Sequence, residues 1–195
     1  MRIITGKFKG RHFEVPRSFK ARPTTDFAKE NIFNVLRAYL DFEEVNALDL
    51  FGGTGSITLE LLSRGCRSVV TVERDRQHFA FIKSCVKSLG VENATPLCGD
   101  ALRFIERCRE RYDLVFADPP YALKEMSELP DRVMGGTLVA DGGLFVLEHG
   151  KEQDFSQRPD FLERRAYGSV NFSLFRRPAM QQASENALDE AGAES

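Results

Sequence analysis

The chain has 195 residues, of which 42% are hydrophobic and 29% are charged. This length fits one domain of roughly 100 to 200 residues, and the composition excludes a disordered or membrane-embedded chain. No apolar run approaches the roughly 20 residues that span a bilayer, and the first ten residues lack the hydrophobic segment of a signal peptide. We therefore expect a cytoplasmic protein that has no contact with a membrane.

Basic residues gather near the N-terminus, although the net charge of −2 argues against strong nonspecific binding of nucleic acid by the whole molecule. The first 22 residues contain one acid, Glu14, and the basic residues Arg2, Lys7, Lys9, Arg11, Arg17, Lys20 and Arg22. Alternating apolar and basic side chains around Gly6 and Gly10 predict a short hairpin outside the main domain. This patch either contacts phosphates or is only a solvated hairpin.

The residues that follow this segment have apolar side chains at the spacing of a helix. An apolar stripe predicts a helix over residues 26–40, and a threonine of the preceding loop can cap its N-terminus. Strands are then expected at residues 47–51, 68–73, 94–98, 112–117 and 143–148. Between the strands, helices are expected at residues 56–64, 76–89, 101–109 and 124–138.

The alternation of strands and helices predicts a doubly wound α/β domain over residues 23–177. Strands such as residues 114–117 are apolar at consecutive positions, as expected when helices cover both faces of a parallel sheet. Residues 161–167 and 170–175 surround Gly168-Ser169 and predict a closing antiparallel hairpin, which gives a mostly parallel seven-stranded sheet. Residues 178–195 are polar, and we expect this tail to be disordered.

A glycine-rich turn follows the first predicted strand of this domain. Residues 49–55 read DLFGGTG and run directly into a helix, so that the backbone can approach a ligand at the carboxyl end of the sheet. A dinucleotide-binding turn would have a third glycine where Thr58 stands, and the lysine of a P-loop is also missing. The pattern resembles motif I of class I methyltransferases, which bind S-adenosylmethionine.

Acids at the ends of later strands fit this cofactor, which has a ribose diol and an ammonium group but no pyrophosphate. Glu73 ends the second strand and can accept both ribose hydroxyls, and Asp100 follows the third strand and can hold the adenine amino group. Each acid can instead cap a helix, a role that we expect for Asp75. The candidate cofactor-binding residues are Asp49, Phe51, Gly52, Gly53, Gly55, Glu73, Asp100, Ala101 and Asp118.

The motif Asp118-Pro119-Pro120-Tyr121 follows the fourth strand at the same edge of the sheet. An exocyclic amino nitrogen of a base is a poor nucleophile, because its lone pair is delocalised into the ring. Asp118 and the carbonyl of Pro119 can accept its two N–H groups while the prolines fix the backbone. Tyr121 can stack on a base that has left its helix or is presented unpaired. An isolated motif of this kind would merely end a strand.

In their order along the chain, these motifs resemble the RsmD family of small-subunit ribosomal RNA guanine-N2 methyltransferases. The resemblance runs from Arg2 to about Arg177 and is carried by residues 2–7, 10–11, 22–26, 33–36, 49–55, 63–65, 73, 99–100 and 113–121. Gly52 departs from the alanine common in the family, a difference that should not prevent cofactor binding. The polar tail also departs from the family pattern.

The resemblance implies a Rossmann-like class I fold, with S-adenosylmethionine as cofactor and S-adenosylhomocysteine as co-product. It implies methylation of the N2 amino group of a guanine in small-subunit ribosomal RNA, with Asp118, Pro119, Pro120 and Tyr121 as catalytic residues. The expected partner is ribosomal RNA, within a small subunit or an assembly intermediate, and we expect a monomer. The candidate RNA-binding residues are Arg2, Lys7, Lys9, Arg11, Arg22 and Thr24.

Three alternatives remain open from the sequence. A DNA adenine-N6 or cytosine-N4 methyltransferase uses a similar proline motif, and a protein-glutamine methyltransferase faces the same chemical problem. The chain could also be a noncatalytic RNA-binding assembly factor. A metal site is not expected, because the four cysteines and three histidines are isolated and lack the spacing of metal ligands; we expect reduced, partly buried thiols.

Overall fold

The computed structural model describes residues 1–19 and 25–179, which contain one seven-stranded sheet in the order β3-β2-β1-β4-β5-β7-β6. The strands are β1 (Asn46–Asp49), β2 (Ser68–Glu73), β3 (Ala94–Cys98), β4 (Tyr112–Ala117), β5 (Val139–His149), β6 (Phe161–Tyr167) and β7 (Val170–Arg176). The helices are α1 (Asp26–Leu36), α2 (Ser56–Ser63), α3 (Arg76–Leu89), α4 (Ala101–Arg107) and α5 (Leu129–Met134). Two 3-10 turns occur at Phe42–Glu44 and Met126–Glu128.

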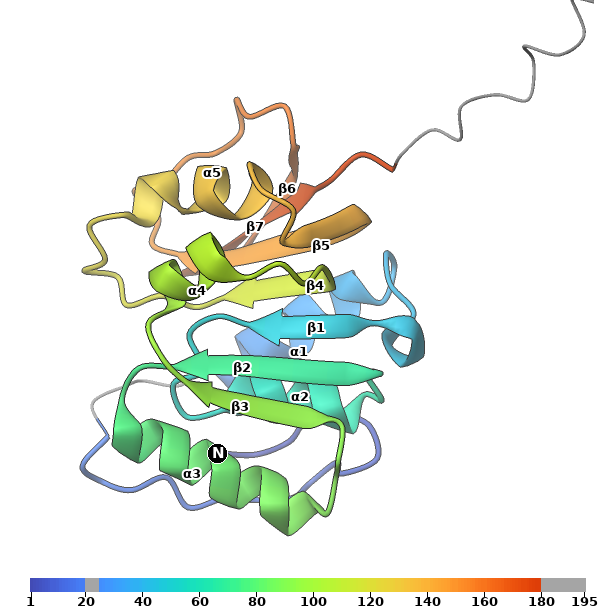
Figure 1. Cartoon of the computed structure of the whole chain (residues 1–195), viewed down its shortest axis with the longest axis vertical. Coiled ribbons are helices and arrows are strands. Elements are labelled where there is room, and N and C mark those ends of the chain that lie inside the picture. Colours follow the sequence, from blue (N-terminus) through green and yellow to red (C-terminus); the bar gives the residue numbers. More distant parts are fainter. Residues whose placement is uncertain (20–24, 180–195) are drawn as a thin grey trace, which may run out of the picture.

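The sheet has a switch point between β1 and β4. Strands β1 to β5 are parallel to one another, and β7 pairs antiparallel with both β5 and β6 (Figure 1). The chain moves outward from β1 to β3 and then returns to place β4 on the other side of β1. Open α/β sheets bind ligands at such a point, outside the carboxyl ends of the strands. The loops after β1 and β4 therefore define the region of interest.

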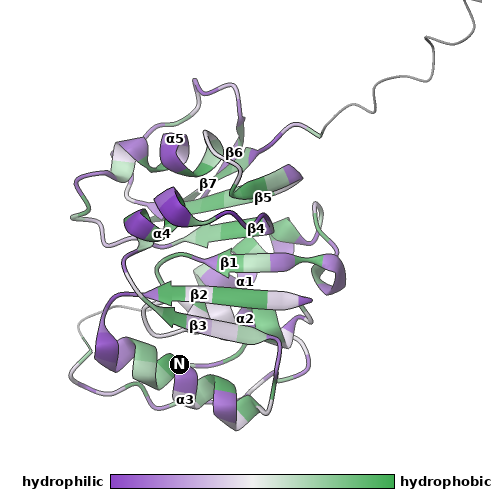
Figure 2. Ribbon diagram, in the orientation of Figure 1, coloured by the Kyte–Doolittle hydropathy of each residue, from purple (hydrophilic) through white to green (hydrophobic). Residues whose placement is uncertain are grey.

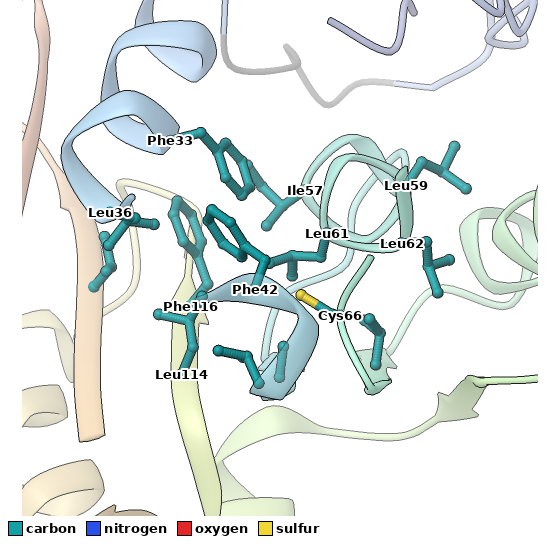
Figure 3. Close-up of a cluster of buried hydrophobic side chains, with 14 of the residues drawn as sticks. Phe33, Leu36, Phe42, Ile57, Leu59, Leu61, Leu62, Cys66, Leu114 and Phe116 are labelled. Atoms are coloured by element: carbon teal, nitrogen blue, oxygen red, sulfur yellow. The ribbon is translucent and has the colours of Figure 1, made fainter. Parts of the chain in front are cut away.

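Two apolar layers cover the sheet, and alternate residues of β4 face each of them. Leu114 and Phe116 belong to the layer formed with α1, α2 and α3, whereas Val115 and Ala117 belong to the layer formed with α4 and α5. Figure 1 shows α1 and α2 behind the sheet and α4 in front of it, and Figure 2 shows the largely hydrophobic strands between them. The ring of Phe33 in α1 stacks on that of Phe116 within the first layer (Figure 3). Burial on both faces confirms the expected doubly wound arrangement.

The observed elements confirm the predicted order, with several differences at their ends. Strands β2, β3 and β4 and helix α3 have the predicted bounds, and the closing hairpin is present. Helix α1 ends at Leu36, not at residue 40, and the chain then makes tight turns. The helix predicted over 124–138 is reduced to a 3-10 turn and α5, whereas β5 begins at Val139, four residues before the predicted start.

The N-terminal segment does not lie outside the domain as predicted. It forms a single bridge between Arg2 and His12, and Ile3 is buried in the layer with α1 and α2. The segment covers the outer side of α2, because Ile4 N–H and Thr5 N–H both donate to the Glu60 carboxylate. Every residue of α2 is therefore buried. The alternating apolar and basic side chains predicted a hairpin, but they did not predict that the segment packs against α2.

Gly6 allows the segment to approach α2 closely. Its φ is +88°, and a Cβ at this position would lie 1.9 Å from the carbonyl oxygen of Ser63. The following residue, Lys7, donates its N–H to that same oxygen at 2.7 Å. A glycine is therefore required on two grounds, its left-handed backbone and the lack of space.

Lys29 joins the N-terminal segment to the start of α2. Its side chain is only 1% exposed, and Nζ donates to the carbonyl oxygen of Arg2 at 2.8 Å and to Oγ of Ser56 at 2.9 Å. Burial lowers the pKa of Lys29, against the opposing effect of Glu60. Ser56 is the first residue of α2 and follows Gly55, so this bond joins the buried ammonium group to the residue that immediately follows the glycine loop, residues 49–55.

Candidate active site

The glycine loop and the proline motif meet at the switch point. Leu50 N–H, immediately after β1, donates to the carbonyl oxygen of Phe116 in β4 at 2.9 Å. Asp49 is paired in register with Phe116, two residues before Asp118. The two motifs that the sequence placed at one edge of the sheet are therefore on adjacent strands.

The glycine loop turns through two glycines with positive φ. Gly53 has φ +53° and Gly55 has φ +79°, and Gly55 is the N-cap of α2. Gly52 has a different role, because a Cβ at this position would lie 2.6 Å from Cγ2 of Thr71 and 3.0 Å from Cδ1 of Ile82. The loop is thus pressed against β2 and α3, and Gly52 is the residue that permits this contact.

Glu73 holds the glycine loop from the end of β2. Its Oε2 accepts the Gly53 N–H at 2.7 Å, and its Oε1 accepts the Asp75 N–H at 2.6 Å. Each carboxylate oxygen has two lone pairs, so these bonds leave acceptor capacity on both oxygens. The structure brings Glu73 and the glycine loop together, as the cofactor interpretation requires.

Asp49 lies beneath the loop in a buried polar chain. Oγ1 of Thr58 donates to Oδ2 of Asp49 at 2.7 Å and also bonds to Oγ1 of Thr71 at 2.7 Å. The other carboxylate oxygen, Oδ1, is buried and has no hydrogen-bond partner among the described residues. Burial raises the pKa of Asp49 to about 6. Thr58, which occupies the position of a third glycine, therefore supports the acid of the motif.

Asp75 and Asp100 both cap helices. Asp75 accepts the N–H groups of Gln77 and His78 at the start of α3, which confirms the structural role predicted for it. Asp100 accepts the Arg103 N–H with Oδ1 at the start of α4, while its Oδ2 lies 3.8 Å from Nη1 of Arg74. An adenine-binding role for Asp100 stays a prediction.

Two further predicted cofactor residues, Phe51 and Ala101, lie beside or within α4. Phe51 is half-buried against the layer formed with α4, and Ala101 is buried as the first residue of α4.

Within residues 1–19 and 25–179, no group of three His, Cys, Asp or Glu side chains is placed to hold a metal ion. The four cysteines are free thiols, two of them buried. Among the described helices, none is both long and apolar enough to cross a membrane.

The proline motif forms a short turn with an exposed aromatic ring. Asp118 is half-buried and Pro119 is buried, whereas Pro120 is exposed and accepts the Leu123 N–H at 2.8 Å. Tyr121 is 55% exposed. Partial burial and the negative charges of Glu148 and Asp118 raise the pKa of Tyr121 to about 12, so its hydroxyl stays protonated at neutral pH.

Glu148 is a site residue that the sequence interpretation missed. It is only 4% exposed near the end of β5, and its Oε1 accepts a hydrogen bond from the Tyr121 hydroxyl at 3.4 Å. Ala117 and Leu147 are paired in parallel register, so the next residues, Asp118 and Glu148, end neighbouring strands side by side. The signal was present, since an acid at the end of a predicted strand is the pattern that pointed to Glu73.

The candidate RNA-binding residues lie partly in the described segment. Arg2, Lys7, Lys9 and Arg11 are all exposed. Arg2 forms an ion pair with Asp26 at 3.2 Å, and Nη2 of Arg11 donates to the carbonyl oxygen of Ser88 at 3.1 Å. Arg22 and Thr24 lie outside the described residues. Thr25, the neighbour of Thr24, caps α1 by accepting the Ala28 N–H, as expected for a threonine of this loop.

Comparison with known proteins identifies the family. Residues 1–176 match the family described as "Conserved hypothetical protein 95". Ribosomal RNA small subunit methyltransferase D of Escherichia coli strain K12 is 28% identical over 186 residues, which cover 94% of this chain and 93% of that protein. The chain belongs to the RsmD family. The Haemophilus influenzae protein of the same name is also 28% identical, over 90% of this chain and 93% of its own length.

Comparison with solved structures shows the fold of this member of the RsmD family. A hypothetical protein from Thermus thermophilus is 31% identical and superposes with a TM-score of 0.79, covering 90% of this chain and 98% of that one. A putative methyltransferase from Escherichia coli is 28% identical and superposes with a TM-score of 0.78, covering 92% of this chain and 98% of that one. Together with the seven-stranded sheet and its antiparallel hairpin, this likeness shows the Rossmann-like fold of class I methyltransferases. The resemblance drawn from the glycine loop and the proline motif is confirmed.

Proposed function

We propose that this protein transfers a methyl group from S-adenosylmethionine to the exocyclic N2 amino group of a guanine in small-subunit ribosomal RNA. The observation that carries the proposal is the position of the glycine loop and Asp118-Pro119-Pro120-Tyr121 on adjacent strands at the switch point. Relatives named as small-subunit ribosomal RNA methyltransferases support the class of substrate.

The residues around the glycine loop fit S-adenosylmethionine. Its sulfonium and ammonium groups are cations. The carboxylates of Asp49 and Glu73 lie close to the loop, and the hydrogen bonds described for them come from backbone N–H groups and a threonine hydroxyl, not from basic side chains. The spare acceptor capacity of Glu73 suits a ribose diol. The unpartnered Oδ1 of Asp49 fits a donor supplied from outside the described chain, directly or through water. When bound, the cofactor supplies an electrophilic methyl group on sulfur.

Asp118 and Tyr121 then prepare the base. Asp118 accepts one N–H of the amino group and the carbonyl of Pro119 accepts the other, so that the nitrogen becomes pyramidal and its lone pair turns toward the methyl group. With S-adenosylmethionine bound, the nitrogen would take the methyl group from its sulfur, with S-adenosylhomocysteine as co-product, and would lose one proton to a nearby acceptor or solvent. The exposed ring of Tyr121 stacks on the base.

The N-terminal segment supplies contacts to RNA phosphates in this proposal. Lys7, Lys9 and Arg11 are exposed on a segment that covers α2, the helix that begins at the glycine loop. We infer that the monomer acts on a small subunit or on an assembly intermediate.

The proposal is tested by following labelled methyl groups into different substrates. The protein is incubated with methyl-labelled S-adenosylmethionine and, in parallel, with unmodified small ribosomal subunits, naked ribosomal RNA and duplex DNA. The products are digested to nucleosides and the labelled species is identified. We expect label in N2-methylguanosine from at least one ribosomal sample.

Each arm of this experiment separates one alternative. Label only in DNA would replace the RNA assignment with a DNA amino-methyltransferase. Label in no nucleic acid, while S-adenosylmethionine still binds, would favour a protein amide as acceptor or a noncatalytic role. The difference between subunits and naked RNA identifies the form of the substrate.

A further inference from the structure

Glu148 is a buried acid at the base end of the site that the methyl transfer described above does not use. Burying a carboxylate costs several kcal/mol unless other groups compensate its charge. Glu148 is 4% exposed, on a strand that is paired on both sides, and the Tyr121 hydroxyl is one of the groups that bond to its carboxylate. It stands beside Asp118 at the ends of β4 and β5.

The contact with Tyr121 shows from which side Glu148 can be reached. The Tyr121 hydroxyl donates to Oε1 of Glu148, and the ring that carries this hydroxyl is 55% exposed. A donor on the open side of the site therefore reaches the buried carboxylate. Because Tyr121 is also the residue placed to stack on a base, the edge of a stacked base would lie near the same carboxylate.

The strand end that carries Glu148 is held firmly. Its neighbour His149 is fully buried, with Nε2 bonded to Oγ of Ser173 at 2.8 Å and Nδ1 bonded to the carbonyl oxygen of Gly150 at 2.7 Å. Glu148 itself is paired with Phe172 of β7. A specificity residue requires a fixed position of this kind.

Guanine is the base whose hydrogen-bonding edge suits two carboxylates at the ends of neighbouring strands. Its Watson–Crick edge presents the ring N1–H and the N2 amino group next to each other, and all of these hydrogens are donors. Adenine and cytosine present an unprotonated ring nitrogen beside the amino group, and its lone pair would face a carboxylate oxygen. When a buried carboxylate oxygen faces the lone pair of a ring nitrogen, neither group has a hydrogen-bond donor. Such a site therefore discriminates strongly against adenine and cytosine.

We propose that Glu148 is the residue that selects guanine, accepting the N1–H of the target base while Asp118 holds its N2 amino group. This inference rests on the proposed function, because it concerns the same site and the same reaction. The N1–H takes over the position of the Tyr121 hydroxyl at Glu148, and the tyrosine ring stacks on the base. Glu148 thus excludes adenine-N6 and cytosine-N4 from a site whose catalytic motif is common to all three reactions.

The test compares guanosine with 2-aminopurine riboside, which keeps the N2 amino group but has an unprotonated N1. An RNA fragment that spans the mapped target nucleotide is synthesised with either nucleoside, and with inosine, which lacks the amino group, as a blank. We expect the wild-type protein to prefer guanosine by at least about 100-fold in kcat/KM. In Glu148→Gln, the amide can donate to N1 or accept from N1–H, so the preference should fall to within about tenfold.

A matched control and a second readout complete the design. Glu152→Gln removes an exposed acid whose charge also acts on Tyr121, and it should keep the wild-type preference. The dissociation constants of both RNA fragments are measured in the presence of S-adenosylhomocysteine, so that a variant without turnover still reports its preference. Glu148→Ala, which removes the acceptor without adding a donor, should lose most of the preference and weaken guanosine binding.

The outcomes separate this inference from the proposed function. If the wild-type protein labels no guanine N2, the proposed function fails first. If it methylates guanosine but both Glu148 variants keep the full preference, in turnover and in binding, Glu148 does not select the base. A loss of preference in Glu148→Gln, with unchanged binding of S-adenosylmethionine, supports the assignment and excludes general damage to the site.

Discussion

The two halves of the candidate site differ in how their residues are held. In the cofactor half, Gly53 is bonded to Glu73, and Asp49 is joined through Thr58 to Thr71 below the loop. In the base half, Tyr121 is 55% exposed and meets Glu148 through a long hydrogen bond of 3.4 Å. The first half is fixed by short bonds between β1, β2 and α2, whereas the second presents an aromatic ring to solvent.

This difference corresponds to the two ligands that the site would hold. A small cofactor is bound best by a site that is already formed, because little ordering is then required on binding. A base that must leave its stack enters from outside and brings its own aromatic surface, so an exposed ring is suited to receive it. Substitutions in the cofactor half should therefore affect stability and cofactor binding, and those in the base half should affect turnover.

The largest effect is expected for Asp118→Ala. Loss of the acceptor for the amino group should lower kcat by about 100- to 1,000-fold, with the dissociation constant of S-adenosylmethionine within about twofold of wild type. Turnover is measured with labelled cofactor and binding by calorimetry. Asp113→Ala is the control, because Asp113 lies at the other end of β4 and binds Asn46. Unchanged turnover in Asp118→Ala would remove Asp118 from the mechanism.

Gly52→Ala tests how tightly the cofactor half is packed. The new Cβ would lie 2.6 Å from Cγ2 of Thr71, which should cost about 2 to 3 kcal/mol of unfolding free energy and weaken cofactor binding. Adding Thr71→Ser removes that methyl group, keeps a hydroxyl for the bond to Thr58, and should restore most of the loss. Urea denaturation and calorimetry measure both effects.

The control for Gly52→Ala is Gly136→Ala, since a Cβ at Gly136 meets no atom within 4 Å. This variant should be neutral within about 0.5 kcal/mol. Failure of Thr71→Ser to rescue Gly52→Ala would mean that another contact, such as that with Ile82, limits the loop. An alanine tolerated without any rescue would contradict the close packing of the loop against β2.

Asp49→Asn tests whether the cofactor half carries a stability cost. Burial raises the folded-state pKa of Asp49 from 3.8 to about 6, so the folded protein binds a proton more tightly than the unfolded chain. Wild-type stability should therefore fall as the pH rises from about 4 to about 6. Asparagine does not ionise, so the variant should gain about 3 kcal/mol over wild type above pH 6, and little near pH 4.

Urea denaturation over this pH range measures the difference, and cofactor binding is followed in parallel. We expect the more stable variant to bind S-adenosylmethionine more weakly. A stability difference that is the same at every pH would show that Asp49 does not titrate in this range. Tighter cofactor binding by the variant would contradict a role for the carboxylate in holding a cation.

The smallest effect is expected outside both halves, for Lys7, Lys9 and Arg11. Changing all three to glutamine should weaken RNA binding by about tenfold and flatten its salt dependence, because fewer counterions are released. The control changes Arg103, Arg107 and Arg109 on the opposite side of the sheet, all of them exposed. Equal affinities and equal salt slopes in both triple variants would make the N-terminal patch a solvated surface.

The sequence predicted those features that depend on neighbouring residues. Strand β4 and helix α3 were predicted with their observed bounds, because burial on both faces of a strand and the spacing of a helix leave local patterns. The glycine turn and the acids at the strand ends were found in the same way. The carboxyl ends of parallel strands share one edge, so local positions also placed the two halves of the site together.

Contacts between distant residues were decided only by the tertiary structure. The bonds from Ile4 and Thr5 to Glu60 span more than fifty residues, and they bring the N-terminal segment into the core. The contact between Tyr121, in the turn after β4, and Glu148, in β5, joins residues 27 positions apart. Buried polar groups must find partners wherever the fold places them. A local sequence pattern does not predict which residues become hydrogen-bond partners, because these residues become neighbours only when the sheet has formed.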